Sequence, residues 1–200
     1  MNMITKIAEF YFKYYGVFIL DKENYLPETY NLDPRFEFKI LNIDDLFLFK
    51  KLDSKKKNYN LYVDRLKSSD FVCFAIIEKS KSEIAYYSWL NFSNRYFVHE
   101  INKVMDFKKE KSVLFQDDNT IEPYLRLGLH KYVMQKRVQY SFENQVNRIY
   151  IVIYLRNVPA LRTVKKIGFK QINFLSIYLR KGTLKYTVKK IMKKTNLFNL

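Results

Sequence analysis

The sequence predicts an α/β fold with a mixed, mostly antiparallel sheet flanked by helices. Arg148–Leu155 contains a run of apolar residues from Ile149 to Tyr154, which is typical of a strand buried on both faces. A polar turn separates two further apolar segments, Phe71–Ile77 and Ile84–Phe92, and this pattern indicates an antiparallel hairpin. The last pair of expected strands is Gln171–Leu179 and Leu184–Val188.

A short helix is expected directly after the buried strand. Asn157 is a good N-cap residue, Pro159 is tolerated in a first helical turn, and Gly168 is a typical helix stop. Three apolar residues between them fall on one helical face: Leu161, Val164 and Ile167. The unit is therefore a strand, a tight turn and an amphipathic helix.

The N-terminal third is less regular. Aromatic and apolar residues in Thr5–Tyr15 have spacings that suit an amphipathic helix ended by Gly16, followed by a short strand at Val17–Leu20. Phe36–Ile40 alternates apolar and charged residues, which predicts a strand with one exposed face, and Asp44-Asp45 marks a helix start.

Length and cysteine content limit the classes of protein. We expect one domain over residues 1–200, with an N-terminal helix and strand extension at 1–35 and a basic tail at 189–200. Cys73 is the only cysteine, so neither an intrachain disulfide nor a thiolate zinc site is possible, and no metal is expected. No run of about twenty apolar residues occurs, and the chain is expected to be soluble and cytoplasmic.

The formal net charge of +16 favours anionic partners through long-range attraction. Coenzyme A, a nucleotide-linked sugar, tRNA and an anionic membrane surface all qualify. No recognised nucleic-acid motif accompanies the charge, so we expect no specific nucleic-acid recognition. The basic tail is either a solvated terminus or a peripheral contact with a membrane or polyanion. Monomer and homodimer both remain open.

The stretch from Asn147 to Phe169 resembles the second cofactor motif of the GNAT family of N-acetyltransferases. The residues at matching offsets are Asn157, Ala160, Leu161, Arg162, Lys166, Gly168 and Phe169. The resemblance implies a GNAT acyl-CoA N-acyltransferase fold, with a sheet splayed between strands 112–119 and 148–155 to admit acetyl-CoA.

The main GNAT cofactor motif is degenerate in this sequence. Gly128 matches its central glycine, whereas Leu125, Arg126 and His130 depart from the usual residues. In the family, backbone amides at this helix start bind the coenzyme A pyrophosphate, since a helix N-terminus offers unpaired N–H groups. His130 would either crowd the pyrophosphate or donate a hydrogen bond to it. The resemblance implies these cofactor-binding residues: Asn119, Thr120, Ile121, Arg126, Gly128, Leu129, His130 and Asn157.

The implied chemistry is direct attack of an acceptor amine on the acetyl-CoA thioester. A protonated amine needs a base, and Asp118 is the first candidate, with Asp117 and Glu122 behind it. Capping or surface roles for these carboxylates remain equally open. A backbone N–H near Asn119 or Thr120 would stabilise the oxyanion.

Regular strand alternation would place Gln116, Asp118 and Thr120 on one face, and Asp117 and Asn119 on the other. Val164 stands where many family members carry a general-acid tyrosine, so that role is empty or supplied elsewhere.

The predicted function is N-acetyl transfer from acetyl-CoA to a small-molecule primary amine. Overall similarity to members of bacterial surface-polysaccharide pathways suggests an amino sugar on a nucleotide carrier. The alternatives are an acetyltransferase acting on a protein or aminoacyl-tRNA amine, and a catalytically degenerate GNAT-fold binding module.

Overall fold

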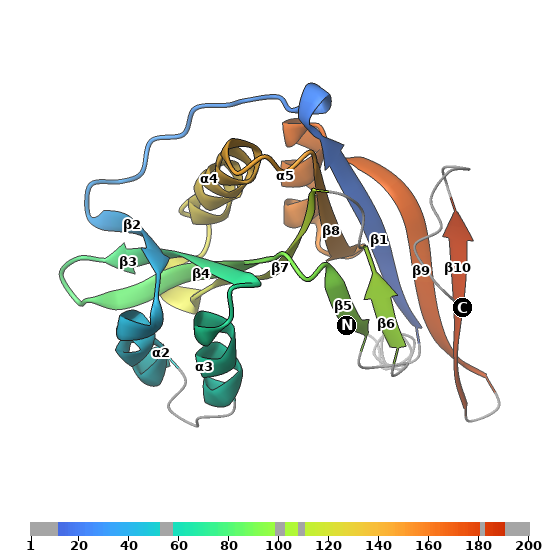
Figure 1. The fold of residues 1–200 in the computed structure, drawn as a ribbon, viewed down its shortest axis with the longest axis horizontal. Helices are drawn as coiled ribbons and strands as arrows, with labels where there is room; N and C mark the ends of the chain where they lie inside the picture. The colour runs from blue at the N-terminus through green and yellow to red at the C-terminus, as the bar shows by residue number, and fades with distance from the viewer. Residues whose placement is uncertain (1–11, 53–57, 99–102, 108–110, 181–182, 191–200) are drawn as a thin grey trace. The chain divides into compact units, whose positions relative to one another are not determined.

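The computed structural model describes residues 12–52, 58–98, 103–107, 111–180 and 183–190 (Figure 1). These residues form two compact units. The first takes its described residues from Met1–Leu26, Asn94–Ser112 and Asn147–Leu200, and the second from Pro27–Ser93 and Val113–Val146.

The first unit contains an antiparallel run of strands in the order β10-β9-β1-β8. Their bounds are Phe12–Asp21 for β1, Arg148–Tyr154 for β8, Lys170–Arg180 for β9 and Thr183–Lys190 for β10. The unit also holds a 3-10 turn, η1 (Lys22–Asn24), the helix α5 (Val158–Ile167) and a two-stranded ladder of β5 (Arg95–Val98) and β6 (Lys103–Asp106). The expected final strand pair and the buried strand before α5 are thus confirmed.

The helix predicted at Thr5–Tyr15 is wrong over its described part, because Phe12–Tyr15 belongs to β1. Residues 5–11 of that prediction lie outside the described residues. β1 pairs with β8 on one side and β9 on the other, so strand pairing along both edges overrides the helical spacing. Gly16 lies inside this strand, and a Cβ there would come within 2.6 Å of the Phe18 ring.

The start and end of α5 are confirmed. Asn157 accepts a hydrogen bond from the Ala160 N–H at 3.2 Å, as expected of an N-cap. Gly168 ends the helix in the left-handed conformation, with φ 108°. A Cβ on Gly168 would lie 2.1 Å from the Asn24 carbonyl oxygen, so the close approach of η1 also requires glycine.

The second unit contains an antiparallel run of strands in the order β7-β4-β3-β2. Their bounds are Phe36–Leu41 for β2, Phe71–Glu78 for β3, Glu83–Asn91 for β4 and Ser112–Thr120 for β7. Its helices are α2 (Leu46–Leu52), α3 (Tyr59–Lys67) and α4 (Leu129–Glu143), with 3-10 turns η2 (Ile43–Asp45) and η4 (Glu122–Tyr124). The predicted hairpin is β3 and β4, and the predicted strand at Phe36–Ile40 is β2.

Helices cover both faces of this second sheet (Figure 1). Phe49 of α2 and Tyr62 of α3 pack with Trp89 of β4 in one aromatic core. On the other face, Tyr140 of α4 contacts the ring of Phe74 at 5.3 Å between centroids. The predicted helix start is confirmed at η2, which leads into α2. Its N-cap is Asn42, whose side chain accepts from the Asp44 N–H at 2.8 Å.

The buried face of α4 includes Leu129 and Val133, whereas Tyr132, Lys136 and Tyr140 are only half-buried. The rest of the buried face is formed by Met134, Gln135, Arg137, Val138 and Ser141. A fully buried arginine therefore occupies a position that apolar spacing did not identify.

Candidate functional site

A β-bulge interrupts β7 next to β4. Tyr87 pairs with Asn119, but the next paired residues are Trp89 and Gln116, so β7 carries one extra residue there. Asp117 has φ 53°, in the left-handed region where aspartate and asparagine are the commonest non-glycine residues.

The bulge changes which side chains share a face. Gln116 lies opposite Trp89, and Asn119 opposite Tyr87, so both lie on the side of the sheet that α3 covers. Asp118 lies on the side of α4, where Arg137 contacts it. The prediction that Gln116 and Asp118 share a face is therefore wrong, because strand alternation breaks at the extra residue. Aspartate and asparagine tolerate the left-handed conformation, so the run Asp117-Asp118-Asn119 is the feature of the sequence that could have indicated a bulge.

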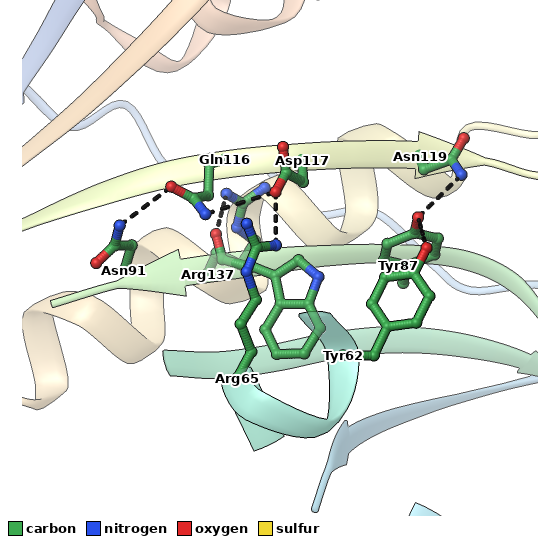
Figure 2. A network of polar contacts seen from close by, with 9 residues as sticks. Tyr62, Arg65, Tyr87, Asn91, Gln116, Asp117, Asn119 and Arg137 are labelled. Carbon is green, nitrogen blue, oxygen red and sulfur yellow. Dashed lines mark hydrogen bonds and ion pairs between the residues drawn. The ribbon is translucent and has the colours of Figure 1, made fainter. Parts of the chain in front are cut away.

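On the α3 side, Arg65 forms an ion pair with Asp117, with 2.6 Å between Nη1 and Oδ2 (Figure 2). The Arg65 guanidinium lies 5.2 Å from the ring centroid of Phe71 and 5.3 Å from that of Trp89. Its side chain is 12% exposed, whereas that of Asp117 is 47% exposed. Gln116 also donates to Asp117 Oδ2 at 3.5 Å. The carboxylate is thus positioned by two donors yet still reaches solvent.

Two phenols lie beside this ion pair. The hydroxyl groups of Tyr62 and Tyr87 are 3.1 Å apart, and Asn119 Nδ2 donates to the Tyr87 oxygen at 3.2 Å (Figure 2). Burial raises the pKa of Tyr87 well above its ordinary value, and the bond to Tyr62 raises it further. The Tyr87 phenol is therefore a neutral hydroxyl.

These side chains line a pocket of about 300 Å³ inside the second unit. Its walls include Leu61, Tyr62 and Arg65 of α3, Tyr87 of β4, and Asp117 and Asn119 of β7. None of the α3 residues was a sequence candidate, because only the packing of α3 against the sheet brings them to the bulge.

On the α4 side, Asp118 accepts hydrogen bonds from Tyr86 and from Arg137 Nη1. Arg137 is fully buried, and its Nη2 donates to the Trp89 carbonyl oxygen at 3.0 Å. The carboxylate predicted as general base is therefore the counter-ion of a buried guanidinium. Asp118 contributes to the pocket lining, but its Oδ1 accepts from both Tyr86 and Arg137 on the opposite side of the sheet.

His130 belongs to the same cluster. Its Nε2 lies 4.0 Å from Asp118 Oδ1, and its ring centroid is 6.2 Å from that of Tyr86. Burial lowers the pKa of His130, while the nearby carboxylate of Asp118 partly opposes that shift. The imidazole is neutral at neutral pH and is directed toward Asp118.

The turn before α4 has the geometry of an anion site. Gly128 is the N-cap in the left-handed conformation, with φ 77°, and Arg126 is left-handed too, with φ 67°. Tyr132 N–H donates to the Gly128 carbonyl, so the N–H groups of the first helical residues, Leu129 to Lys131, have no partner within the helix. A Cβ on Gly128 would meet nothing within 4 Å, which leaves room for a bound group. A pyrophosphate would fit these residues.

Polar contacts fix the position of this turn. The Tyr124 hydroxyl donates to Glu78 Oε2 at 2.6 Å, and Lys81 forms an ion pair with the same oxygen at 2.9 Å. The hydrogen bond from Tyr124, followed by that from Lys81, lowers the pKa of Glu78 to about 2. Ile121 N–H donates to the Ala85 carbonyl at 2.9 Å, which extends the β4 pairing beyond β7.

The remaining sequence candidates lie apart from this cluster or in the other unit. Glu122 is exposed on η4, and its carbonyl accepts from Leu125. Asn157 caps α5 in the first unit, where Val164 is fully buried and offers no proton donor.

Within the described ranges, no group of three or more histidine, cysteine or acidic side chains is arranged to hold a metal ion. No helix in the described part of the chain is long and apolar enough to cross a membrane.

Solved structures share this fold at low sequence identity. The tandem GNAT protein from the clavulanic acid biosynthesis pathway matches with TM-score 0.59 and 9% identity, over 82% of this chain and 53% of that chain. The GCN5-related N-acetyltransferase from Sphaerobacter thermophilus matches with TM-score 0.52 and 7% identity, over 94% of this chain and 56% of that one. A probable acetyltransferase matches with TM-score 0.52 and 15% identity, over 67% of this chain and 89% of the other.

The chain spans little more than half the length of the first two of these proteins. No protein-family model and no curated protein matches the sequence. The structural matches establish a GNAT fold, and the predicted fold class is confirmed.

Proposed function

We propose that this chain, which has the GNAT fold, is an N-acetyltransferase that moves the acetyl group of acetyl-CoA to the primary amine of a small molecule. The observation that carries the proposal is that the second unit contains two sites of different chemistry. The open turn at Gly128, with the unpaired amides at the start of α4, suits a phosphorylated donor. The polar pocket at the bulge of β7 suits a small polar acceptor.

The backbone at the start of α4 would hold the pyrophosphate of acetyl-CoA, which supplies the activated acetyl group when bound. The amides of Leu129 and His130 point out of the helix start, and exposed Arg126 adds a positive charge beside them. The His130 ring is turned toward Asp118. In this proposal its backbone amide binds the cofactor, and its imidazole does not.

The end of β7 offers an amide for the developing oxyanion. Antiparallel pairing directs alternate N–H groups to the neighbouring strand. Because Ile121 N–H donates to β4, the N–H of Thr120 points away from β4 and is left for another acceptor on that side. Thr120 is therefore the better of the two predicted oxyanion donors.

The proton of the acceptor amine would pass to Asp117, directly or through water. Asp118 was the first candidate, but its carboxylate is held by Arg137 and Tyr86 on the α4 side. Asp117 lines the pocket with a half-exposed carboxylate. Because a base must reach the proton that it removes, we assign the role of general base to Asp117 instead of Asp118.

The direct test is release of the coenzyme A thiol from acetyl-CoA in the presence of a panel of primary amines, with the acetylated product identified by mass spectrometry. Amine-dependent thiol release with a matching product mass would support the proposal. Tight acetyl-CoA binding with no acetylated product from any amine would favour the second candidate, an inert binding module. The buried Val164, where the family has a tyrosine, motivates that candidate.

A further inference from the structure

We infer that the pocket beside the bulge binds the acceptor, and that the acceptor is a small amine carrying several hydroxyl groups. The inference rests on the proposed function, because it assigns the substrate class of that reaction. It comes from the chemistry of the pocket walls, where one carboxylate oxygen is left to a ligand and neutral hydroxyl and amide groups surround it.

Asp117 supplies the site for a positive charge. Both contacts that it makes with Arg65 and Gln116 go to Oδ2, so among described residues Oδ1 has no protein donor (Figure 2). The side chain is 47% exposed and is already positioned by the backbone bulge. An ammonium group placed at Oδ1 would form a charge-assisted hydrogen bond without displacing Arg65.

The neutral groups suit hydroxyls. The phenols of Tyr62 and Tyr87 and the carboxamide of Asn119 form one hydrogen-bonded chain along the pocket wall (Figure 2). A phenol can donate one hydrogen bond and accept others, so the chain keeps free capacity after its internal bonds are made. A ligand hydroxyl can therefore both donate and accept here, whereas an aliphatic ammonium group can only donate.

Size and charge narrow the ligand further. A volume of about 300 Å³ lies at the lower end of small-molecule sites and has room for one sugar-sized ring. Among the described lining residues the only cation is Arg65, and it is mostly buried and paired with Asp117. A phosphate or carboxylate would find no unpaired cation among them. The lining thus favours a free hydroxylated amine over a nucleotide-linked one.

Three small molecules test separately the need for an ammonium group and the need for hydroxyl groups. Glucosamine carries an ammonium group and hydroxyls, glucose carries the hydroxyls alone, and cyclohexylamine carries the ammonium group alone. Binding is measured by titration calorimetry on the full chain without acetyl-CoA. We expect glucosamine to bind at least tenfold more tightly than either of the others. Equal affinity for cyclohexylamine and glucosamine, or no binding of glucosamine, would overturn the inference.

Asp117→Asn tests the ammonium site, since asparagine accepts the left-handed conformation at this position. It should weaken glucosamine binding at least tenfold and leave acetyl-CoA binding unchanged. The matched control is Asp64→Asn, which removes an exposed carboxylate from α3 outside the pocket lining and should leave both affinities unchanged. Tyr62→Phe serves as a second variant should Asp117→Asn unfold, and should weaken glucosamine binding severalfold.

The outcomes separate this inference from the proposed function. Asp117-dependent glucosamine binding without acetyl transfer would contradict the proposed function and retain the pocket as a ligand site. Acetyl transfer to the lysines of a test peptide, unaffected by Asp117→Asn, would overturn the inference and the role of Asp117 as base, and would retain acetyl transfer as the activity. An equal effect of Asp117→Asn and Asp64→Asn would also overturn it.

Discussion

The fully buried Arg137 of α4 donates a hydrogen bond to Asp118. On the opposite side of β7, Arg65 forms an ion pair with Asp117, whose side chain is 47% exposed. Two neighbouring carboxylates of one bulge therefore hold two arginines on opposite faces of the same sheet. The two pairs differ in how much water reaches them, so we expect the loss of each carboxylate to have a different effect on stability.

Asp118→Asn is expected to destabilise the protein by about 3 kcal/mol, because it leaves the charge of Arg137 buried without a counter-ion. Asp117→Asn should cost no more than about 1 kcal/mol, since water screens the exposed partner of that pair. Urea unfolding of both variants checks the order. Equal losses would show that the burial of Arg137 does not determine the cost.

The two left-handed glycines should respond differently to alanine. Gly128→Ala should cost about 1 kcal/mol from backbone strain alone, because open space surrounds that position. Gly168→Ala should cost several times more, since its Cβ would lie 2.1 Å from the Asn24 carbonyl oxygen as well. Thermal unfolding of the two variants gives the comparison, and a Gly168→Ala midpoint at or above that of Gly128→Ala would contradict the packing described for η1.

His130 should make the protein less stable in mild acid. Its folded-state pKa is lowered by burial, so below its ordinary value of 6.5 the unfolded chain binds more protons at this site than the folded chain. Stability should therefore fall as the pH decreases from about 6.5, the unfolded-state pKa of histidine. The urea midpoint of the parent and of His130→Asn, followed from pH 7.5 to 5, tests this sign. The variant should lose less stability over that range, and an identical slope would exclude His130 as a contributor.

Glu78 should affect stability at lower pH than His130 does. Its pKa of about 2 lies below the ordinary value, so its stabilising contacts with Tyr124 and Lys81 persist above pH 4.5 and are lost as the pH falls toward 2. Because Tyr124 leads into the turn before α4, Glu78→Gln should also weaken acetyl-CoA binding severalfold. The matched control is Glu143→Gln, an exposed change at the far end of α4 that should leave binding unaltered.

Local signals predicted the parts of this fold that depend on neighbouring residues in sequence. Asn157 and Gly168 delimit α5 because capping and left-handed geometry are local properties. β1 was mistaken for a helix in part, because its partners β8 and β9 come more than a hundred residues later in the chain.

The site was less predictable for the same reason. Gly128 lies at the start of a helix, as the sequence predicted, but the role assigned to Asp118 depended on regular alternation, which the bulge at Asp117 breaks. Arg65 and Arg137 carried no sequence signal, because only tertiary packing places one over aromatic rings and buries the other. The pocket at the bulge is visible in the folded chain alone.

The most direct test of the central claim is the affinity for acetyl-CoA of two variants at the N-cap of α4, Gly128→Asp and Gly128→Asn, measured by titration calorimetry. The two side chains have the same size, and both tolerate the left-handed conformation and cap a helix well. If the turn holds a pyrophosphate, the added negative charge of the aspartate should weaken binding at least tenfold relative to the asparagine variant, which should remain close to the parent. Equal affinities in the two variants, or no binding of acetyl-CoA by the parent, would contradict the account.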